Sequence, residues 1–332
     1  MIKIGQIGLN FGLKAHIPSF KKDRRFELAS VCSYDIRKAK KISENLGVSH
    51  FTDNPGDLFE KVDAISFAIP PSEQSKWVPK AIKSGLHVFF EKPLGYKAKK
   101  LLPVNPSQAL MVDFEFLEID VWKILFNKIT SGELGQILHC EVVWNVETYA
   151  VSNNTKSWKT DIHQNGGTLN NFGSHVFYYL EELFGSIASI SAISKPEIKL
   201  SDETIYLLLQ FSSGQAGSVA ISTNTYRGSG HTIEVTGSKG TAVLKNPNNS
   251  TVSDFELKVS YKDGSAEEHK SEWKKGDSKD DRILAITQLV YKFGDWIERG
   301  EIQSPNINAA IRVEHLISKT IESIKKNKNI IV

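Results

Sequence analysis

The sequence predicts an α/β protein in two parts, a doubly wound parallel sheet followed by a second domain whose sheet is mostly antiparallel. From Ile2 to Lys92, short apolar runs alternate with helical patterns. Continuous apolar runs are typical of parallel strands that are buried on both faces. After Gly132 the segments become longer and alternate apolar with polar residues, which fits an antiparallel sheet with one covered face. At 332 residues, the chain also exceeds what one hydrophobic core usually supports.

The individual elements follow from these two patterns. In the first part we expect helices that begin at Gly12, Ile36 and Glu73, and strands at Ile2–Ile7, Leu28–Ser33, Ala64–Ile69 and Val88–Phe90. In the second part the expected strands are Leu138–Glu147, Ile187–Ser194, Ile205–Phe211, Ala216–Asn224, Thr232–Thr236 and Thr241–Leu244. A helix from about Asn170 to Phe184 interrupts them, and a last helix, Asn308 to Lys326, has one apolar face that needs a docking surface.

Composition narrows the class of protein. The net charge of +3 comes from scattered lysines without a basic stripe, so we expect neither nucleic acid nor a membrane surface as a partner. Cys32 and Cys140 both lie in apolar runs, where buried free thiols are usual, and no metal site is expected. We find neither an apolar stretch of spanning length nor a signal peptide, so we expect a soluble, cytoplasmic protein.

The stretch IGQIGLNFGLKAH, from Ile4 to His16, resembles a dinucleotide-binding loop between a strand and a helix. Such loops use glycines for a tight turn and for close approach to a pyrophosphate. Here Gly8 holds the first glycine position, Asn10 the second, and Gly12 comes one residue before the third. Asn tolerates left-handed torsions better than other side chains do. The alternative is a structural turn that binds nothing.

The end of the second predicted strand bears on the choice of cofactor. An acid in this place usually binds the adenosine ribose. This chain has Ser33 there, followed by Asp35, Arg37 and Lys38. A serine and two cations would accept a 2′-phosphate that an aspartate would repel, which favours NADP over NAD. The alternative is that Asp35 caps the next helix and that the basic residues are a solvated face.

Two downstream stretches complete the pattern. In HVFFEKPLG a buried strand ends in Glu91, Lys92 and Pro93, at the edge where open α/β sheets bind ligands. NGGTLNNFGSHVFYYLEELFG leads into a helix with Asn171 and His175 four residues apart. With AIPPSEQ, SGELGQI, GSKGT and the closing AAIRVEHLISKTIESIKKNKNIIV, the chain resembles the glucose-fructose oxidoreductase / inositol dehydrogenase family of nicotinamide-dependent dehydrogenases.

The resemblance implies a fold and an assembly. It implies a Rossmann domain at residues 1–117, an α+β domain with a large open sheet at 118–306, and a last helix at 307–332 that returns to the Rossmann domain. It also implies a homodimer or homotetramer built on that sheet. By the same resemblance the peptide bond before Pro93 is commonly cis.

It further assigns roles by position. Lys92 would polarise the oxygen at the reacting carbon and His175 would exchange its proton, with Asn171 as a third catalytic residue. The expected cofactor-binding residues are Gly8, Asn10, Phe11, Gly12, Ser33, Arg37, Lys38, Ile69, Pro70, Gln74, Glu91, Lys92 and Trp158. The expected substrate-binding residues are Glu115, Tyr149, Asn171 and His175. The alternative for Lys92 and His175 is a surface lysine and a histidine in a packing face.

Departures from the family pattern leave the function open. Asn171 stands where relatives often have aspartate, and an amide cannot take a proton. Asp113 and Glu115 stand where glycine and polar or basic residues are usual, so the substrate is expected to be neutral or cationic. We expect an NADP(H)-dependent oxidoreductase that acts on a sugar, a sugar derivative or a nucleotide-linked sugar. The alternatives are a sensor or regulator with the same fold and an NAD-dependent glycosidase.

Overall fold

The computed structural model describes residues 1–95, 107–153, 155, 157–196, 202–247, 252, 254–273 and 280–332. By internal contacts the chain divides into two compact units. The first unit is Met1–Glu115 with Gly276–Ile311, and the second is Phe116–Lys275 with Arg312–Val332.

The first unit is built on a six-stranded parallel sheet in the order β3-β2-β1-β4-β5-β6. This order, which reverses direction at β1, is the one that dinucleotide-binding folds use. The sheet therefore has a ligand crevice at the carboxyl ends of its strands, where β1 and β4 diverge. Its strands are β1 (Ile2–Ile7), β2 (Phe26–Cys32), β3 (His50–Thr52), β4 (Ala64–Phe67), β5 (His87–Phe90) and β6 (Leu110–Val112).

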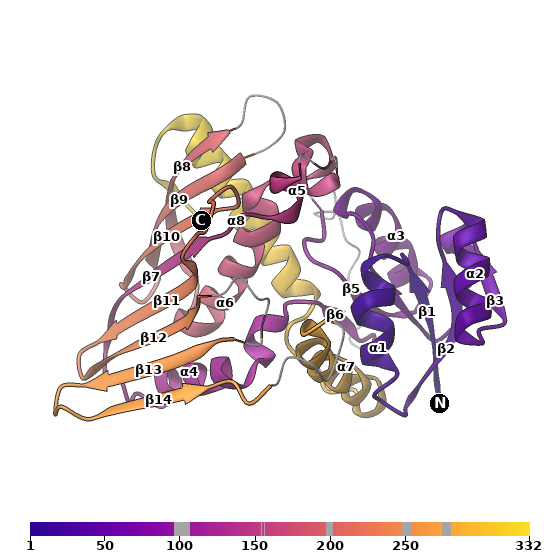
Figure 1. Ribbon diagram of the computed structural model, residues 1–332, viewed down its shortest axis with the longest axis horizontal. Helices are drawn as coiled ribbons and strands as arrows, with labels where there is room; N and C mark the ends of the chain where they lie inside the picture. Colours follow the sequence, from indigo (N-terminus) through magenta and orange to yellow (C-terminus); the bar gives the residue numbers. More distant parts are fainter. Residues whose placement is uncertain are drawn as a thin grey trace. The chain divides into compact units, whose positions relative to one another are not determined.

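Helices cover this sheet (Figure 1). They are the π-helical turn η1 (Gly12–His16), α1 (Ile17–Phe20), α2 (Ile36–Leu46), the 3-10 turn η2 (Pro55–Leu58), α3 (Pro71–Lys83) and α7 (Arg282–Arg299). The apolar face of α7, with Ile286, Leu289 and Phe293, packs in one core with sheet residues such as Ile4 and Phe89. Burial of these large side chains contributes most of the stability of the unit.

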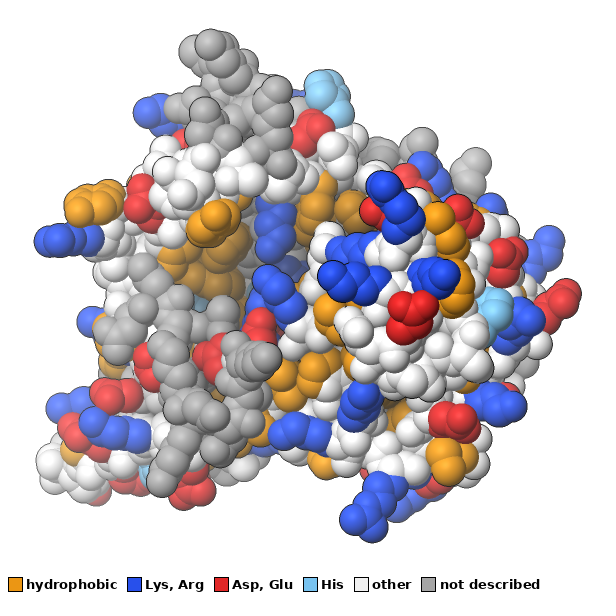
Figure 2. Space-filling view, turned by 45° about the vertical axis from the view of Figure 1, so that its right-hand side comes forward, with side chains coloured by type: hydrophobic (Ala, Val, Ile, Leu, Met, Phe, Trp, Pro, Cys, Tyr) orange, Lys and Arg blue, Asp and Glu red, His pale blue; other side chains and the backbone are white. Residues whose placement is uncertain are grey.

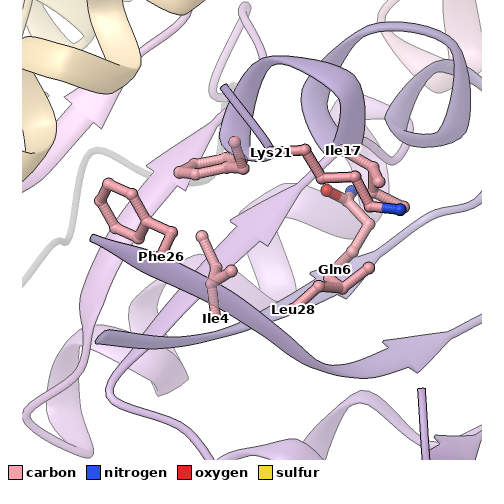
Figure 3. Close-up of a pocket in the computed structure, with 7 residues that line it drawn as sticks. Ile4, Gln6, Ile17, Lys21, Phe26 and Leu28 are labelled. Carbon is pink, nitrogen blue, oxygen red and sulfur yellow. The ribbon is translucent and has the colours of Figure 1, made fainter. Parts of the chain in front are cut away.

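A small cavity lies beneath α1 (Figure 3). Its volume is about 20 Å³, and it is lined by Ile4, Gln6, Ile17, Phe20, Lys21, Phe26 and Leu28. A void of this size admits one water molecule and no cofactor or substrate. The ligand site of this unit has to lie elsewhere, at the strand ends.

The second unit is built on a nine-stranded sheet in the order β14-β13-β12-β11-β7-β10-β9-β8-β15. Neighbouring strands are antiparallel except for the parallel pair β7 and β10. Its strands are β7 (Ile137–Asn145), β8 (Ile187–Pro196), β9 (Asp202–Phe211), β10 (Ala216–Ser222), β11 (Gly230–Gly237), β12 (Gly240–Asn246), β13 (Glu256–Tyr261), β14 (Ala266–Lys270) and β15 (Ile330–Ile331).

Helices cover one face of this sheet (Figure 1). They are α4 (Asp120–Thr130), α6 (Ser174–Phe184) and α8 (Ile307–Lys326). Of α8, only the part from Arg312 on belongs to the second unit. Short elements precede α6: η4 (Glu115–Glu118), α5 (Tyr149–Ser152), η5 (Trp158–Thr160), η6 (Ile162–Gln164) and the π-helical turn η7 (Leu169–Gly173). Along β9, Leu207 and Leu209 are buried whereas Tyr206 and Leu208 are exposed. The other face of the sheet is therefore open in the chain.

The predicted fold class is confirmed, and the predicted elements are present with shifts of a few residues at their ends. The division of the chain differs from the expected one. Residues 282–299, rather than the last helix, pack on the Rossmann sheet, because α7 carries the apolar face that covers it. From Arg312 on, the chain packs with the second unit, where β15 pairs with β8.

The structure also bears on the two cysteines and on membrane-spanning helices. Cys32 and Cys140 are both buried and free, as expected. Among the described residues, we find no helix long and apolar enough to cross a membrane.

Candidate active site

Gly8 makes the tight turn at the end of β1. Its φ of +92° lies in the region that favours glycine, and an added Cβ would clash with the carbonyl oxygen of Ala68. Its N–H donates to the carbonyl of Cys32 at 3.0 Å, which ties the turn to the end of β2. The first glycine of the sequence pattern is therefore required by the geometry, as the dinucleotide-loop interpretation demands.

Gly12 is required for a different reason. It begins the π-helical turn η1, and a Cβ there would clash with the side chain of Gln6. Gln6 is buried inside β1, and its amide donates to the carbonyls of Ile7 and Gly8 at 3.1 and 3.2 Å. Gln6, which the sequence analysis did not single out, thus braces the loop from below. The displaced glycine is accommodated by a wider helical turn and a buried amide.

The end of β2 lies beside this loop. The Lys38 ammonium donates to the side-chain oxygen of Asn10 at 2.6 Å. Asp35 caps α2 by accepting from the backbone N–H groups of Arg37 and Lys38. Desolvation alone would raise the pKa of Asp35, but these two hydrogen bonds and the Arg37 charge together lower it. Ser33 is half-buried and accepts from the Asp35 N–H at 3.3 Å. The helix-cap alternative for Asp35 is therefore correct, and Ser33 and Lys38 remain next to the loop.

A second strand end is organised by Gln74. Ile69 and Pro70 connect β4 to α3, and Gln74 lies fully buried in the first turn of that helix. Its amide donates to the carbonyl of Glu91 at 2.5 Å and to that of Pro93 at 3.0 Å. The peptide bond between Lys92 and Pro93 is cis. Gln74 was expected to bind cofactor; in the structure its amide holds the turn that carries Lys92.

His16 lies at the centre of a buried ion cluster. Its Nδ1 is 2.8 Å from the hydroxyl of Ser66 in β4. Its Nε2 is 3.1 Å from a carboxylate oxygen of Glu91 and 3.3 Å from one of Asp113, which follow β5 and β6. The imidazole is 0% exposed, and the Asp113 carboxyl is 2% exposed. We call His16, Glu91 and Asp113 the imidazole–carboxyl cluster.

The charges of this cluster follow from its contacts. Burial alone would lower the pKa of His16, but its hydrogen bonds to Asp113 and Glu91 raise that pKa to about 9. Burial and the charge of Glu91 raise the pKa of Asp113 well above its ordinary value. Burial opposes ionisation of Glu91, yet the hydrogen bond from His16 holds its pKa below the ordinary value. At neutral pH the cluster therefore holds an imidazolium beside the Glu91 carboxylate, and of the two carboxyl groups Asp113 is the one that ionises less readily.

Lys92 is half-buried in the field of several charges. Burial lowers its pKa, and the carboxyl groups of Glu91, Glu115 and Asp113 act against this. Burial also raises the pKa of Glu115 to about 7, with Lys92 opposing the shift. The Arg282 guanidinium lies 4.4 Å from the centre of the Phe11 ring and pairs with Asp280. The predicted cofactor residue Phe11 is thus part of the wall around these charges.

The imidazole–carboxyl cluster is also the one group among the described residues whose His and carboxyl atoms lie close enough to share a metal ion. The ring nitrogen that faces the carboxyls carries a proton at neutral pH, because the pKa of His16 is raised to about 9. A metal ion would have to displace this proton in order to bind there. The contacts of His16 with the two carboxyl groups account for the arrangement of the cluster.

In the second unit, Asn171 and His175 lie on consecutive helical turns. Asn171 belongs to η7, and its amide donates to the carbonyls of Gly167 at 2.9 Å and Lys159 at 3.3 Å. His175 is in the first turn of α6 and is buried. The amide of Asn171 thus fixes the backbone that leads to His175. Its carbonyl oxygen is the atom with which it could orient a substrate hydroxyl.

Aromatic rings surround His175. The ring of Phe116 meets it edge to face at 4.9 Å, and the ring of Trp144 lies 6.3 Å away. By its resemblance to the family, the sequence placed Phe116 near the substrate. Trp144 was not predicted, because alternation along a strand shows burial but not which ring it meets. The two rings pack against the imidazole of His175 and fix its place in the core of the second unit.

Tyr149 and Trp158 lie on short helices of the same unit. Tyr149 begins α5 and is 77% exposed. Trp158 begins η5 and is half-buried, and the neighbouring Lys159 accepts from Asn171. The turn that contains Trp158 is therefore joined to Asn171 through the carbonyl of Lys159, whereas the side chain of Tyr149 is exposed to solvent. Their predicted roles toward cofactor and substrate stay predictions.

The parallel sheet, the glycine turn and the buried charges at the strand ends define a dinucleotide-dependent oxidoreductase. The amino-terminal part matches the model described as "Oxidoreductase family, NAD-binding Rossmann fold" over residues 2–104. Residues 127–332 match the corresponding "C-terminal alpha/beta domain". The chain belongs to the glucose-fructose oxidoreductase / inositol dehydrogenase / MocA family, as its sequence predicted. It is an NAD(P)-dependent oxidoreductase.

Similar proteins give the range of the family. An uncharacterized oxidoreductase of Synechocystis sp. is 25% identical over 268 residues, which are 74% of this chain and 72% of that one. A dTDP-3,4-didehydro-2,6-dideoxy-alpha-D-glucose 3-reductase of Actinomadura kijaniata is 26% identical over 41% of this chain and 43% of its own. The structure of levoglucosan dehydrogenase with NADH and levoglucosan has a TM-score of 0.88 at 18% identity, covering 100% of this chain and 99% of the other.

Proposed function

We propose that the protein transfers a hydride between NADP(H) and a carbon of a sugar, a sugar derivative or a nucleotide-linked sugar. The observation that carries the proposal is the end of β2, where Ser33, Lys38 and Asn10 lie beside the glycine turn. The residues proposed to hold the cofactor are those of the loop, with Gly8 and Gly12 as its turn, and those at the ends of β2, β4 and β5. When bound, the nicotinamide would accept or donate the hydride.

The preference for NADP over NAD rests on charge. Asp35, the acid nearest this strand end, is engaged with the N-terminus of α2. The Lys38 ammonium and the exposed Arg37 side chain then supply positive charge for a 2′-phosphate. Figure 2 shows Lys and Arg side chains close together on the surface of the first unit. A carboxylate at position 33 would repel the same phosphate.

Fluorescence titration with NADPH and NADH tests this preference. We expect NADPH to bind at least about tenfold more tightly, and Ser33→Asp to reverse the order by removing a hydrogen-bond donor and adding like charge. Ser49→Asp, which adds the same charge at another exposed position of the unit, is the control and should leave the order unchanged. Equal binding of both cofactors by the wild type would contradict the NADP assignment.

The chemistry proposed for the chain's own residues uses Lys92 and His175. An alcohol that loses a hydride must also lose its hydroxyl proton, and a carbonyl that gains a hydride must receive one. We assign this proton exchange to His175 and the stabilisation of the charge on the substrate oxygen to the Lys92 ammonium. Asn171 would orient a neighbouring hydroxyl through its carbonyl oxygen. His175 is buried with the rings of Phe116 and Trp144 packed near it, and an imidazole is the side chain best suited to exchange a proton near neutral pH.

The substrate class rests on relatives and on charge. Two similar proteins are named for a dTDP-linked sugar and for levoglucosan. The carboxyl groups of Glu91, Glu115 and Asp113 all act on the charge of Lys92, which disfavours a substrate carboxylate in this place. Turnover of NADP⁺ with neutral, amino and acidic sugars and with dTDP- and UDP-sugars tests the class. Neutral or amino substrates should be preferred, and faster turnover of sugar acids would contradict this.

A second candidate is a sensor or regulator that binds the cofactor and a sugar without turnover. One observation favours it: Asn171 stands where a proton-accepting acid would be expected, and its amide is engaged with two backbone carbonyls. Tight cofactor binding together with no turnover of any sugar in the panel would support the sensor. An NAD-dependent glycosidase would instead cleave a glycoside with no net change in cofactor absorbance.

We also propose that the open face of the nine-stranded sheet joins two copies of the chain. Ile193, Tyr206 and Leu208 on this face are 68%, 57% and 66% exposed. They border a groove of about 520 Å³ on β8, β9 and β10. Light scattering should show a dimer or tetramer, and Leu208→Glu should dissociate it. A monomeric wild type would contradict the proposal.

A further inference from the structure

We propose that His16 is a positioning residue for Lys92, acting as an imidazolium that holds the Glu91 carboxylate and thereby fixes the turn that carries the lysine. The inference rests on the proposed role of Lys92 at the reacting oxygen. His16 ends the helical turn of the dinucleotide loop. We assign it a role in the reaction that it exerts through Lys92 and not through a contact of its own with the substrate.

The geometry joins separate elements at one point. His16 ends the helical turn η1, Ser66 lies in β4, and Glu91 and Asp113 directly follow β5 and β6. The ring nitrogens meet the Ser66 hydroxyl on one side and both carboxyl groups on the other. One imidazole thus ties the cofactor loop to the ends of three neighbouring strands.

Glu91 passes this constraint on to Lys92. Its backbone N–H donates to the carbonyl of Phe67 at 3.0 Å, and its own carbonyl accepts from Gln74 at 2.5 Å. Gln74 also holds the carbonyl of Pro93, on the other side of the lysine. With its carboxylate held by His16, Glu91 is fixed at three points. The residue that follows it therefore begins from a defined backbone position.

The charges near the ring support an imidazolium. Phe11 and Phe89 meet the ring edge to face at 5.4 and 5.2 Å and exclude water without supplying charge. The charged groups around the cluster are Lys92, Glu115 and Arg282, the last paired with Asp280. Two carboxyl groups on one nitrogen outweigh the cost of burial, which is why the pKa of His16 is raised to about 9. A neutral ring would leave the Glu91 charge without its buried partner.

The chain offers a matched control in His50. Its Nδ1 is 2.6 Å from the hydroxyl of Ser30, in the same sheet, which copies the contact between His16 and Ser66. Burial is the first cause that lowers the pKa of His50, with Lys61 adding to it. Each histidine therefore has a serine hydroxyl on Nδ1, but only His16 has two carboxyl groups on its other ring nitrogen.

The first experiment measures the charge state directly. In the full-length protein without cofactor, labelled with ¹⁵N at histidine, the His16 ring should show two protonated nitrogens at pH 8, where an ordinary histidine is neutral. The signal is assigned by its loss in His16→Gln, and His50 should be neutral at the same pH. A neutral His16 ring at pH 8 would overturn the proposal, whether or not the protein turns over a sugar.

The second experiment is a double-mutant cycle in turnover. His16→Gln and Glu91→Gln should each lower kcat about tenfold or more, because each leaves one buried charge unpaired. Cofactor affinity should change less than about threefold, since Gly8 and Gly12 keep the loop. The double variant removes both charges and should recover at least about threefold over the worse single variant. His50→Gln should leave kcat unchanged.

The outcomes separate the two proposals. Loss of turnover in the double variant equal to the product of the single losses would show that His16 only fills space, and would overturn the inference. Absence of turnover in the wild type would overturn the proposed function, and the inference with it as a statement about catalysis. The ring signal would still show whether the imidazolium exists.

Discussion

Two buried histidines, one in each unit, have opposite charge behaviour. His16 lies among Phe11, Phe89 and two carboxyl groups, and its pKa is raised to about 9. His231 lies flat on Trp144, with ring centres 4.0 Å apart, and its Nε2 is 3.1 Å from the Tyr179 hydroxyl. Burial lowers the pKa of His231 to about 3.

The comparison shows which neighbours make a buried histidine positively charged. Both rings are buried and both touch aromatic rings, so burial alone would make both neutral. Two carboxyl oxygens within 3.3 Å reverse the outcome for His16. The first unit therefore places a fixed positive charge at its strand ends, whereas the aromatic cluster around His231 in the second unit holds a neutral ring.

The largest expected effect is the acid sensitivity that His231 confers. Its folded pKa lies below its unfolded value of 6.5, so its contribution is present above pH 6.5 and is lost as the pH falls toward 3. A shift from 6.5 to about 3 corresponds to about 5 kcal/mol in the free energy of unfolding. His231→Phe should remove this acid dependence, measured by urea denaturation between pH 7 and 4. An unchanged slope in the variant would contradict the neutral ring.

The next effect has the opposite sign. The folded pKa of His16 lies above its unfolded value of 6.5, so the stabilisation is complete below pH 6.5 and is lost as the pH rises through about 9. This corresponds to about 3 kcal/mol. His16→Gln should flatten the alkaline loss of stability in urea, and His50→Gln should retain it. If the free energy of unfolding of both variants falls with rising pH as steeply as that of the wild type, the buried ion pair is not formed.

A smaller effect is expected from Tyr179→Phe. The change removes the hydrogen-bond partner of a buried ring nitrogen of His231 and leaves that nitrogen unsatisfied. We expect a loss of about 1 to 2 kcal/mol in the free energy of unfolding at pH 7. Tyr291→Phe, at a half-exposed position on α7, serves as the control. A loss no larger than that of the control would show that the hydrogen bond contributes nothing net.

The smallest effect concerns Glu115. Its pKa is raised to about 7, so above pH 7 it carries a negative charge that favours the Lys92 ammonium. In Glu115→Gln this support is lost, and the alkaline limb of kcat/KM should move to lower pH by less than about one unit. An alkaline limb that moves to higher pH would show that the two groups do not interact as described.

Much of the fold could be predicted from the sequence, because buried strands are rich in apolar residues and end at turn-forming residues such as glycine and proline. Ile2–Ile7 was expected and observed with the same bounds, since its isoleucines lead directly into the glycine turn at Gly8. The hairpin of β13 and β14 was missed because an edge strand such as AEEHK is almost entirely polar. The helix α7 (Arg282–Arg299) was not among the expected elements, so its place on the Rossmann sheet was not predicted either.

The sequence predicted several residues of the candidate site, but it did not predict which of them contact one another. Gly8, Glu91 and Lys92 follow from position in a strand–loop–helix pattern. The partners of His16 do not, because Glu91 lies 75 residues further on and the register of the sheet decides their meeting. Gln74 was expected at the cofactor, yet its burial and its two backbone acceptors become visible only in three dimensions.

The most direct measurement of the central claim is turnover with NADP⁺ and the preferred sugar in Lys92→Met and His175→Gln. The account predicts that each variant loses at least about a hundredfold in kcat, because each removes a group proposed to act at the reacting oxygen. It also predicts that both still bind NADPH with nearly wild-type affinity, as measured by fluorescence. Wild-type turnover in either variant would contradict the assignment.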